Sequence, residues 1–239
     1  IIFSISRGNK TGGINQSPNF PNDRYYDTDT SNNLEISFKH LSNTFSFDLN
    51  TFKISRKTPQ LRLYVQHSND PTSFDYATFN ANRVNAYGFE FTSTYEISDK
   101  INILNDFSYL NSKLSTFTFN NITYGNRQSA HSPKYQYQIS LLFNITENSN
   151  IRFTKTYTDK FYFDDQSENI ANAYYLLNAS YHISLNKIDL SIWSNNLKDT
   201  KYPIRGYTFI LDPTGIEDDY ISYGNKRQSG ITLSYTFRK

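Results

Sequence analysis

The chain has 239 residues, of which 17% are aromatic and 37% hydrophobic, and its mean hydropathy is −0.65. This composition is too aromatic for a disordered chain and too polar for a membrane-spanning helix, which needs an apolar run of about 20 residues. Acidic and basic residues are interspersed to a formal net charge of +2, which gives no case for nucleic-acid binding, and the absence of cysteine excludes disulfides and thiolate chemistry.

The sequence starts within an alternating pattern and without an initiator methionine. Ile1, Phe3 and Ile5 alternate with Ile2, Ser4 and Ser6. A period of two residues is typical of a β-strand with one apolar face. We therefore expect the chain to start inside a strand and to be the C-terminal part of a larger protein.

The same alternation returns along most of the chain. Each segment places apolar residues on one face and small or hydrogen-bonding residues on the other. Beyond Phe52 the phase slips and Pro59 interrupts the pattern, which predicts a bulge or an edge there. No stretch repeats every 3.6 residues, so we expect almost no helix. The segments after the first are 34–39, 45–52 with a continuation at 61–65, 88–97, 101–109, 135–145, 151–157, 175–184, 188–192 and 230–237.

The connections between these segments alternate in length. Short turns are expected near 42–43, 98–100, 147–149 and 185–186, and long loops over 8–33, 67–82, 119–134, 159–172 and 196–227. Outer-membrane barrels require this alternation, because their periplasmic turns are short and their extracellular loops are long. The pattern predicts an all-β fold, an antiparallel transmembrane β-barrel segment of about ten strands.

The distribution of charge agrees with a lipid-facing surface. A basic side chain on the lipid face at the bilayer midplane costs roughly 2–4 kcal/mol, and the expected outward faces carry almost no charge. Lys155 is the exception, and it either snorkels near a rim or marks an error in our register. The opposite faces carry charged residues that suit a wet or plugged interior. These are Glu90, Asp106, Arg152, His182 and Asp189.

Five short motifs, in order along the chain, resemble those of TonB-dependent outer-membrane receptors. Each falls at the expected end of a strand. They are Ser6 to Asn15 (SRGNKTGGIN), Leu34 to Lys39 (LEISFK, with Ser37 in place of glycine), Asn85 to Glu90 (NAYGFE), Asn196 to Tyr202 (NLKDTKY, with Lys198 in place of an aromatic residue), and Gly224 and Arg227 with the closing Tyr235-Thr236-Phe237.

The resemblance implies that residues 1–239 are the C-terminal portion of a barrel of about 22 strands, with the plug and the TonB box preceding Ile1. It implies an outer-membrane receptor of a Gram-negative bacterium that binds a scarce ligand, above all a ferric siderophore. TonB, acting through the plug, would supply energy for import to the periplasm. By the same resemblance the chain has outer-membrane lipid as its surroundings, needs no cofactor of its own and is not an enzyme.

Aromatic and basic residues on the long loops are the candidates for ligand contact. Such side chains suit an anionic, aromatic metal chelate. Ordinary loop packing is the alternative interpretation for each of them. The candidates are Arg24, Tyr25, Tyr26, His131, Arg205 and Tyr207.

Other chemical motifs are weak. Gly12-Gly13 lacks the following Lys-Ser/Thr of a phosphate-binding loop, and we interpret it as loop flexibility. The four histidines show no metal-ligand spacing. His182 and Ser184 share one face, which raises the possibility of a hydrolase, although no third group is evident.

Three other classes of protein stay open at this point. The first is a complete small barrel, such as a passive porin or an autotransporter translocator. The second is a soluble extracellular β-sandwich acting as an adhesin, in which the aromatic faces of two sheets would bury one another. The third is a barrel phospholipase that depends on His182.

Overall fold

A computed structural model describes residues 1–67, 69–211 and 215–237 of the chain. The regular structure of these residues consists of strands. No helix in this part of the chain is long and apolar enough to cross a membrane.

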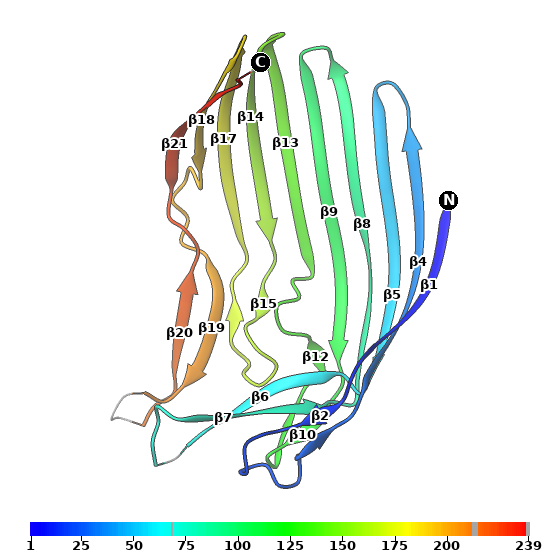
Figure 1. Cartoon of the computed structure of the whole chain (residues 1–239), viewed down its shortest axis with the longest axis vertical. Helices are drawn as coiled ribbons and strands as arrows, with labels where there is room; N and C mark the ends of the chain where they lie inside the picture. The colour runs from blue at the N-terminus through cyan, green and yellow to red at the C-terminus, as the bar shows by residue number, and fades with distance from the viewer. Residues whose placement is uncertain (68, 212–214, 238–239) are drawn as a thin grey trace.

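Ten strands form one continuous antiparallel sheet that curves into a trough (Figure 1). Each of them pairs with the next one along this path, and β12 (Arg127–Gln128) extends the ladder at the end of β9. The expectation of about ten antiparallel strands is confirmed. The ten are β1 (Ile2–Lys10), β4 (Asp29–Leu41), β5 (Phe45–Lys57), β8 (Arg83–Ser98), β9 (Ile101–Leu114), β13 (Tyr135–Thr146), β14 (Ser149–Thr158), β17 (Tyr174–Leu185), β18 (Ile188–Asn195) and β21 (Gln228–Tyr235).

The connections alternate between two ends of the sheet, as the sequence predicts. The short-turn end carries the tight turns at 42–44, 99–100, 147–148 and 186–187. The long-connection end carries five longer segments, each of which folds back as a small hairpin. These hairpins pair β2 (Gly13–Ile14) with β3 (Tyr25–Tyr26), β6 (Gln60–Gln66) with β7 (Phe74–Asn80), β10 (Phe117–Phe119) with β11 (Ile122–Tyr124), β15 (Phe161–Tyr162) with β16 (Ile170–Ala171), and β19 (Pro203–Phe209) with β20 (Asp218–Tyr223).

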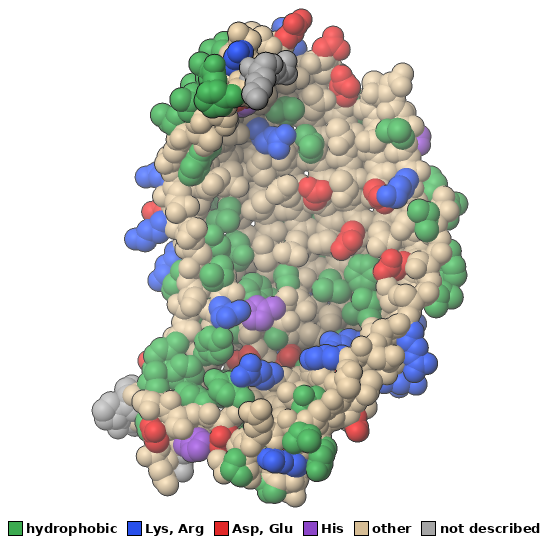
Figure 2. All heavy atoms as spheres, viewed as in Figure 1, with side chains coloured by type: hydrophobic (Ala, Val, Ile, Leu, Met, Phe, Trp, Pro, Cys, Tyr) green, Lys and Arg blue, Asp and Glu red, His purple; other side chains and the backbone are tan. Residues whose placement is uncertain are grey.

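The two faces of the sheet differ in polarity. On the outward face, Leu141 is 42% exposed and Phe153 is 53% exposed, and no second sheet covers them among the described residues. The β-sandwich hypothesis is therefore wrong, because it requires these side chains to be buried. Figure 2 looks into the hollow of the trough, whose floor is largely polar with scattered acidic side chains.

The structure corrects the predicted phase slip in β5. The register of β5 with β4 and β8 runs to Lys57 without a shift, so Phe52 points into the hollow and Lys53 points outward. The apparent slip arises because outward positions become basic toward the long-connection end. Pro59 makes no bulge in this strand. It follows Thr58, whose φ is +51°, and the chain turns there from the ten-stranded sheet, which we call the wall, into the β6–β7 hairpin.

The register at Lys155 is the predicted one. Lys155 pairs with Ile139 on one side and with Leu177 on the other, so its side chain belongs to the outward face. The cation is thus a real feature of the apolar surface, and the alternative of an error in register is excluded.

Candidate functional site

The long connections fold over their end of the trough, and we call this layer the loop cap (the described parts of residues 11–28, 58–82, 115–134, 159–173 and 196–227). Its main element is the β6–β7 hairpin, which crosses the hollow from the β5 and β8 side toward β19 and β20 (Figure 1). The cap therefore covers part of this end of the hollow (Figure 1).

The β6–β7 hairpin is held by a small apolar core. Leu63 and Ala77 are opposite one another in the hairpin, and each is only 1% exposed. They pack with Phe20 of the first connection and with Phe117 and Phe119 of β10. The alternation of β6 thus buries its apolar side in the cap, and the other side, with Tyr64 and Gln66, turns toward the remaining connections.

Two glutamines join the hairpin to distant connections. The Gln166 side chain accepts a hydrogen bond from Tyr64 N and donates one to Tyr64 O, both at 2.9 Å. The Gln66 side chain accepts one from Ile210 N at 3.1 Å and donates to Ile210 O. Each amide imitates a backbone peptide, so two bridges hold the far end of the hairpin against β19 and the 159–173 connection.

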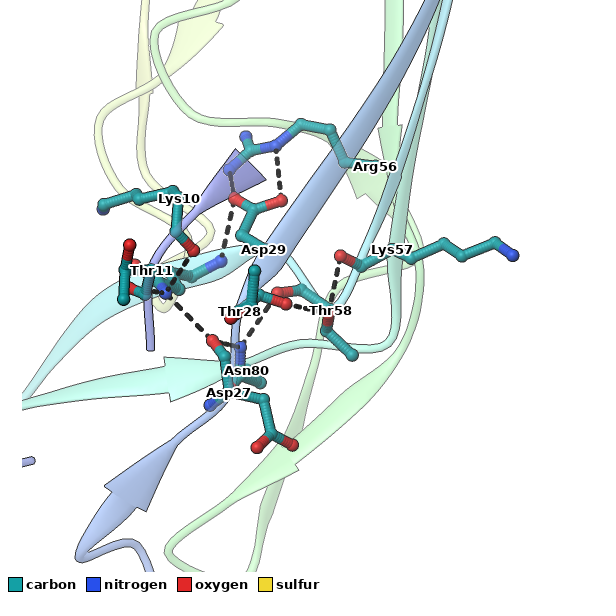
Figure 3. A network of polar contacts seen from close by, with 10 residues as sticks. Lys10, Thr11, Asp27, Thr28, Asp29, Arg56, Lys57, Thr58 and Asn80 are labelled. Carbon is teal, nitrogen blue, oxygen red and sulfur yellow. Dashed lines mark hydrogen bonds and ion pairs between the residues drawn. The ribbon is translucent and has the colours of Figure 1, made fainter. Parts of the chain in front are cut away.

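The root of the hairpin is fixed by a polar network (Figure 3). Asp29, with a side chain 5% exposed, forms an ion pair with Arg56 near the end of β5. Gln60 Nε2 lies 2.9 Å from the carbonyl oxygens of both Thr11 and Asp27. A buried carboxylate needs such partners, and together they tie β4, β5 and β6 at one point.

A pocket of about 260 Å³ opens where four connections meet. Its lining combines aromatic rings with amide and hydroxyl groups. Arginine and lysine are absent from the described lining, and the single charged group is the Glu217 carboxylate. The lining residues are Tyr64, Val65, Gln66, Phe119, Asn120, Ile122, Tyr124, Gln166, Ser167, Thr208 and Glu217.

Tyr64 is the central polar group of this pocket. Burial, reinforced by the nearby Asp164 and Glu217 carboxylates, raises the pKa of its phenol above the ordinary value. The phenol therefore stays protonated and donates a hydrogen bond of 3.2 Å to Thr208 O. The pocket offers neutral donors, acceptors and ring faces to a ligand.

A buried cation lies on the hollow side of the cap. Arg127 is opposite Leu114 in the β12–β9 ladder, and its side chain is 8% exposed. Its guanidinium stacks 4.1 Å from the Tyr162 ring centroid. Its Nη2 donates to Asp164 O at 3.0 Å, but Nε and Nη1 have no hydrogen-bond acceptor among the described residues. Burial also raises the pKa of nearby Asp165, whose Oδ1 accepts from Ala130 N at 2.9 Å.

The six residues predicted from sequence as ligand contacts lie at the cap, but they form no single cluster. Arg24 and Tyr25 are exposed on the first connection, and Arg205 and Tyr207 are exposed on β19. His131 is exposed on the third connection, with its ring 5.4 Å from that of Phe161. None of these residues lines the pocket described above.

Tyr26, the sixth predicted contact, has a packing role. Its ring lies over Gly13, where a Cβ would overlap the Tyr26 hydroxyl, and a Cβ on Gly12 would overlap the Tyr26 carbonyl oxygen. The interpretation of Gly12-Gly13 as loop flexibility is therefore wrong. Both glycines allow close approach of β3.

The residues that build the pocket are not indicated by any pattern in the sequence. Tyr64, Tyr124 and Gln166 occur in separate connections of ordinary polar composition. The alternation of β6 and β7 could have indicated a hairpin, but the partners of Gln166 and Gln66 lie 102 and 144 residues away. No local pattern identifies such contacts.

Asp189 lies near His182 and Ser184 as a third polar group, but the three side chains do not form a catalytic arrangement. His182 Nδ1 contacts Ser191 Oγ at 3.0 Å, while Ser184 donates to Asp189 instead. Asp189 Oδ1 is 4.0 Å from His182 Nε2, beyond hydrogen-bond distance. Strands β17 and β18, which carry these residues, each pair with a neighbouring strand on both sides. These ladders occupy the backbone N–H groups that an oxyanion hole would need.

The wall of the hollow is polar and acidic at its centre (Figure 2). A recess of about 460 Å³ runs over β8, β9, β13 and β14, and Glu90 and Asp106 line it. Gln138 Nε2 donates to Asp106 Oδ2 at 3.3 Å. Such a surface suits water or polar protein groups and explains why these charges face away from the apolar side.

Comparison with protein families decides the class. The sequence model described as "TonB dependent receptor-like, beta-barrel" matches residues 1–197. The chain belongs to this family. Its members are outer-membrane β-barrels that act as receptors and transporters, and the small-barrel and phospholipase alternatives lose their support.

Two bacterial receptors and one transporter illustrate the likeness. The chain is 25% identical over 197 residues to the "Probable TonB-dependent siderophore receptor PiuA" of Acinetobacter baumannii, covering 78% of this chain and 25% of that protein. The solved PiuA structure has a TM-score of 0.69 at 20% identity and 97% coverage of this chain, which spans 32% of PiuA.

The ferric yersiniabactin uptake receptor FyuA of Yersinia pestis has a TM-score of 0.76 at 18% identity, with 99% of this chain and 34% of FyuA covered. The copper transporter OprC has a TM-score of 0.77 at 9% identity, with 98% of this chain and 38% of OprC covered. These structures show a shared fold. The chain of this TonB-dependent receptor family member spans about a quarter to two fifths of the relatives named here.

Proposed function

We propose that this chain forms part of the wall and the loop cap of an importer that takes a scarce extracellular ligand across the outer membrane. Family membership carries the proposal. The apolar outward face and the polar hollow support it, because an outer-membrane barrel needs a lipid-facing surface around a wet or plugged interior. The long-connection end would face the outside of the cell, and the short-turn end the periplasm.

A ferric siderophore is the proposed cargo, with TonB as the source of energy. The proposal is supported by PiuA and FyuA, whose names give a siderophore and ferric yersiniabactin as ligands. OprC, a copper transporter, has the same fold, so the fold alone does not select the cargo.

We further propose that additional strands complete the barrel to about 22 and that a plug fills the hollow, which would connect the chain to TonB. The edges of the sheet support this, because β1 and β21 each have one ladder and no second partner among the described residues. The polar recess at Glu90 and Asp106 offers a surface that a plug could contact.

The proposed ligand contacts are of two kinds. The exposed residues of the cap surface remain proposed ligand contacts. The pocket around Tyr64 and Tyr124 is a second proposed contact region. The six surface and packing residues proposed from sequence are Arg24, Tyr25, Tyr26, His131, Arg205 and Tyr207.

Uptake of labelled iron tests the function. A strain that lacks the receptor should fail to accumulate ⁵⁵Fe from one of a panel of purified ferric siderophores, and the intact gene should restore uptake. A protonophore should abolish that uptake, whereas a passive pore would be insensitive to it. Equal uptake of every ferric siderophore with and without the gene would refute the proposed cargo.

A matched pair of variants tests the pocket. Tyr124→Ala removes a pocket ring, and Tyr25→Ala removes an exposed ring outside it. Loss of one aromatic contact of about 1.4 kcal/mol weakens binding about tenfold. We expect that loss for Tyr124→Ala, and loss confined to Tyr25→Ala would place the contact on the cap surface instead.

A further inference from the structure

Lysines occur among tyrosines on the outward face, toward the long-connection end of β13, β14 and β17. Lys155 Nζ lies 6.0 Å from the ring centroid of Tyr137 and 5.3 Å from that of Tyr175. Lys134, just before β13, lies 5.8 Å from the Tyr135 ring centroid. All three tyrosines belong to the outward face by register.

Tyr175 is shared by two cations. Lys198, in the segment after β18, lies 5.7 Å from the Tyr175 ring centroid and donates a 3.5 Å hydrogen bond to the Tyr175 hydroxyl. Lys155 approaches the same ring. Two ammonium groups on one aromatic ring form a local concentration of positive charge.

These cations have no acidic partner within the described part of the chain. The ion pairs found there involve other side chains, and no carboxylate lies within 4.0 Å of Lys134, Lys155 or Lys198. All three lysines are exposed. The Asp159 carboxylate lies near this face but accepts a 3.3 Å hydrogen bond from the Tyr157 hydroxyl, so no ion pair among the described residues neutralises the lysines.

An apolar groove of about 240 Å³ adjoins Lys155. Its apolar lining residues are Ile139, Leu141, Phe153, Leu177 and Leu197, the last of which precedes Lys198 in the sequence. The groove is open along the outward face. Its lining crosses β13, β14 and β17 at one level, and its apolar side chains suit part of a hydrocarbon chain, with the polar end of the same molecule at the lysines.

We propose that the groove and the lysines form a binding site for a lipid with a phosphate headgroup, in the leaflet at the long-connection end. An acyl chain occupies the groove, and the phosphate is bound by Lys155 and Lys198. Charge complementarity selects this occupant, because a cationic site beside an apolar groove matches an anionic amphiphile. The inference rests on the proposed membrane placement of the outward face.

Two lipids with the same acyl chains provide the test. The receptor, purified in a mild detergent, is titrated with dioleoyl phosphatidic acid and with dioleoylglycerol, which lacks the phosphate, and bound lipid is measured by native mass spectrometry. Lys155→Gln and Lys198→Gln should each weaken phosphatidic acid binding about fivefold, with larger loss in the double variant. Lys187→Gln, in a short turn at the opposite end, controls for net charge and should bind as the unmodified chain does.

Three outcomes would overturn the inference. They are equal binding of the two lipids, unchanged binding by the double variant, and a loss with Lys187→Gln as large as with Lys155→Gln. Circular dichroism verifies that each variant keeps its strand content. Uptake of ⁵⁵Fe is measured separately, so a failure of lipid binding with uptake intact refutes this site alone, whereas a receptor that does not insert into membranes refutes the proposed function.

Discussion

The wall and the loop cap reach stability by different means. The wall is a ladder of neighbouring strands whose apolar side chains, such as Leu141 and Phe153, stay exposed toward the surroundings. The cap buries its apolar side chains in a core of its own and uses side chain to backbone hydrogen bonds over as many as 144 residues. Under the proposed membrane placement, lipid decides which substitutions the wall tolerates, whereas internal packing decides which substitutions the cap tolerates.

The largest effect of a single substitution is expected in the cap core. Leu63→Ala removes a side chain that is 1% exposed, and truncations of this kind cost roughly 2–5 kcal/mol. Native-state hydrogen exchange should show faster opening of β6 and β7, with the wall amides unchanged. Ile122→Ala, which truncates a cap residue 53% exposed, is the control. Equal opening in the two variants would mean that the cap lacks a true core.

The next effect separates the two faces of the wall. Leu141→Lys places a cation on the outward face and should lower the free energy of unfolding from lipid vesicles by roughly 2–4 kcal/mol. Gln138→Lys, on the same strand, places the same cation on the hollow side beside Asp106 and should have little effect. Urea titration measures both. Similar losses in the two variants would show that the outward face does not contact lipid.

The contrast explains how far the sequence could predict this structure. The alternation of residues in the wall appears directly in the sequence, because each strand has an apolar outward side and a polar side toward the hollow. The apparent slip after Phe52 misled the prediction, since Lys53 is outward only because it is near the rim. The loop lengths, by contrast, indicated the strand count and the direction of every strand.

The candidate site was less predictable for a physical reason. Surface chemistry singled out Arg205 and Tyr207, which are indeed exposed on the cap. The pocket depends instead on the path of β6–β7 across the hollow, which brings Tyr64 to Gln166 and Thr208. Polar contacts between distant connections leave no periodicity, so only the folded cap reveals them.

The smallest of these effects concerns the glutamine bridges and asks whether the cap moves as one unit. Gln166→Met keeps the length of the side chain but removes both hydrogen bonds to the Tyr64 backbone. Loss of a typical bond costs about 0.5–1.5 kcal/mol, so exchange of the Tyr64 amide should accelerate about two- to tenfold.

The Ile210 amide, which donates to Gln66, reports on the second bridge. If the bridges are independent, its exchange rate stays as in the unmodified chain. If the hairpin detaches as a unit, Ile210 accelerates together with Tyr64. We expect joint acceleration, because both bridges hold the same rigid hairpin, whose root stays fixed by Gln60 and Asp29. Faster amide exchange at Tyr64 alone would contradict detachment of the hairpin as a unit. It would show that only the contact with the segment around Gln166 opens.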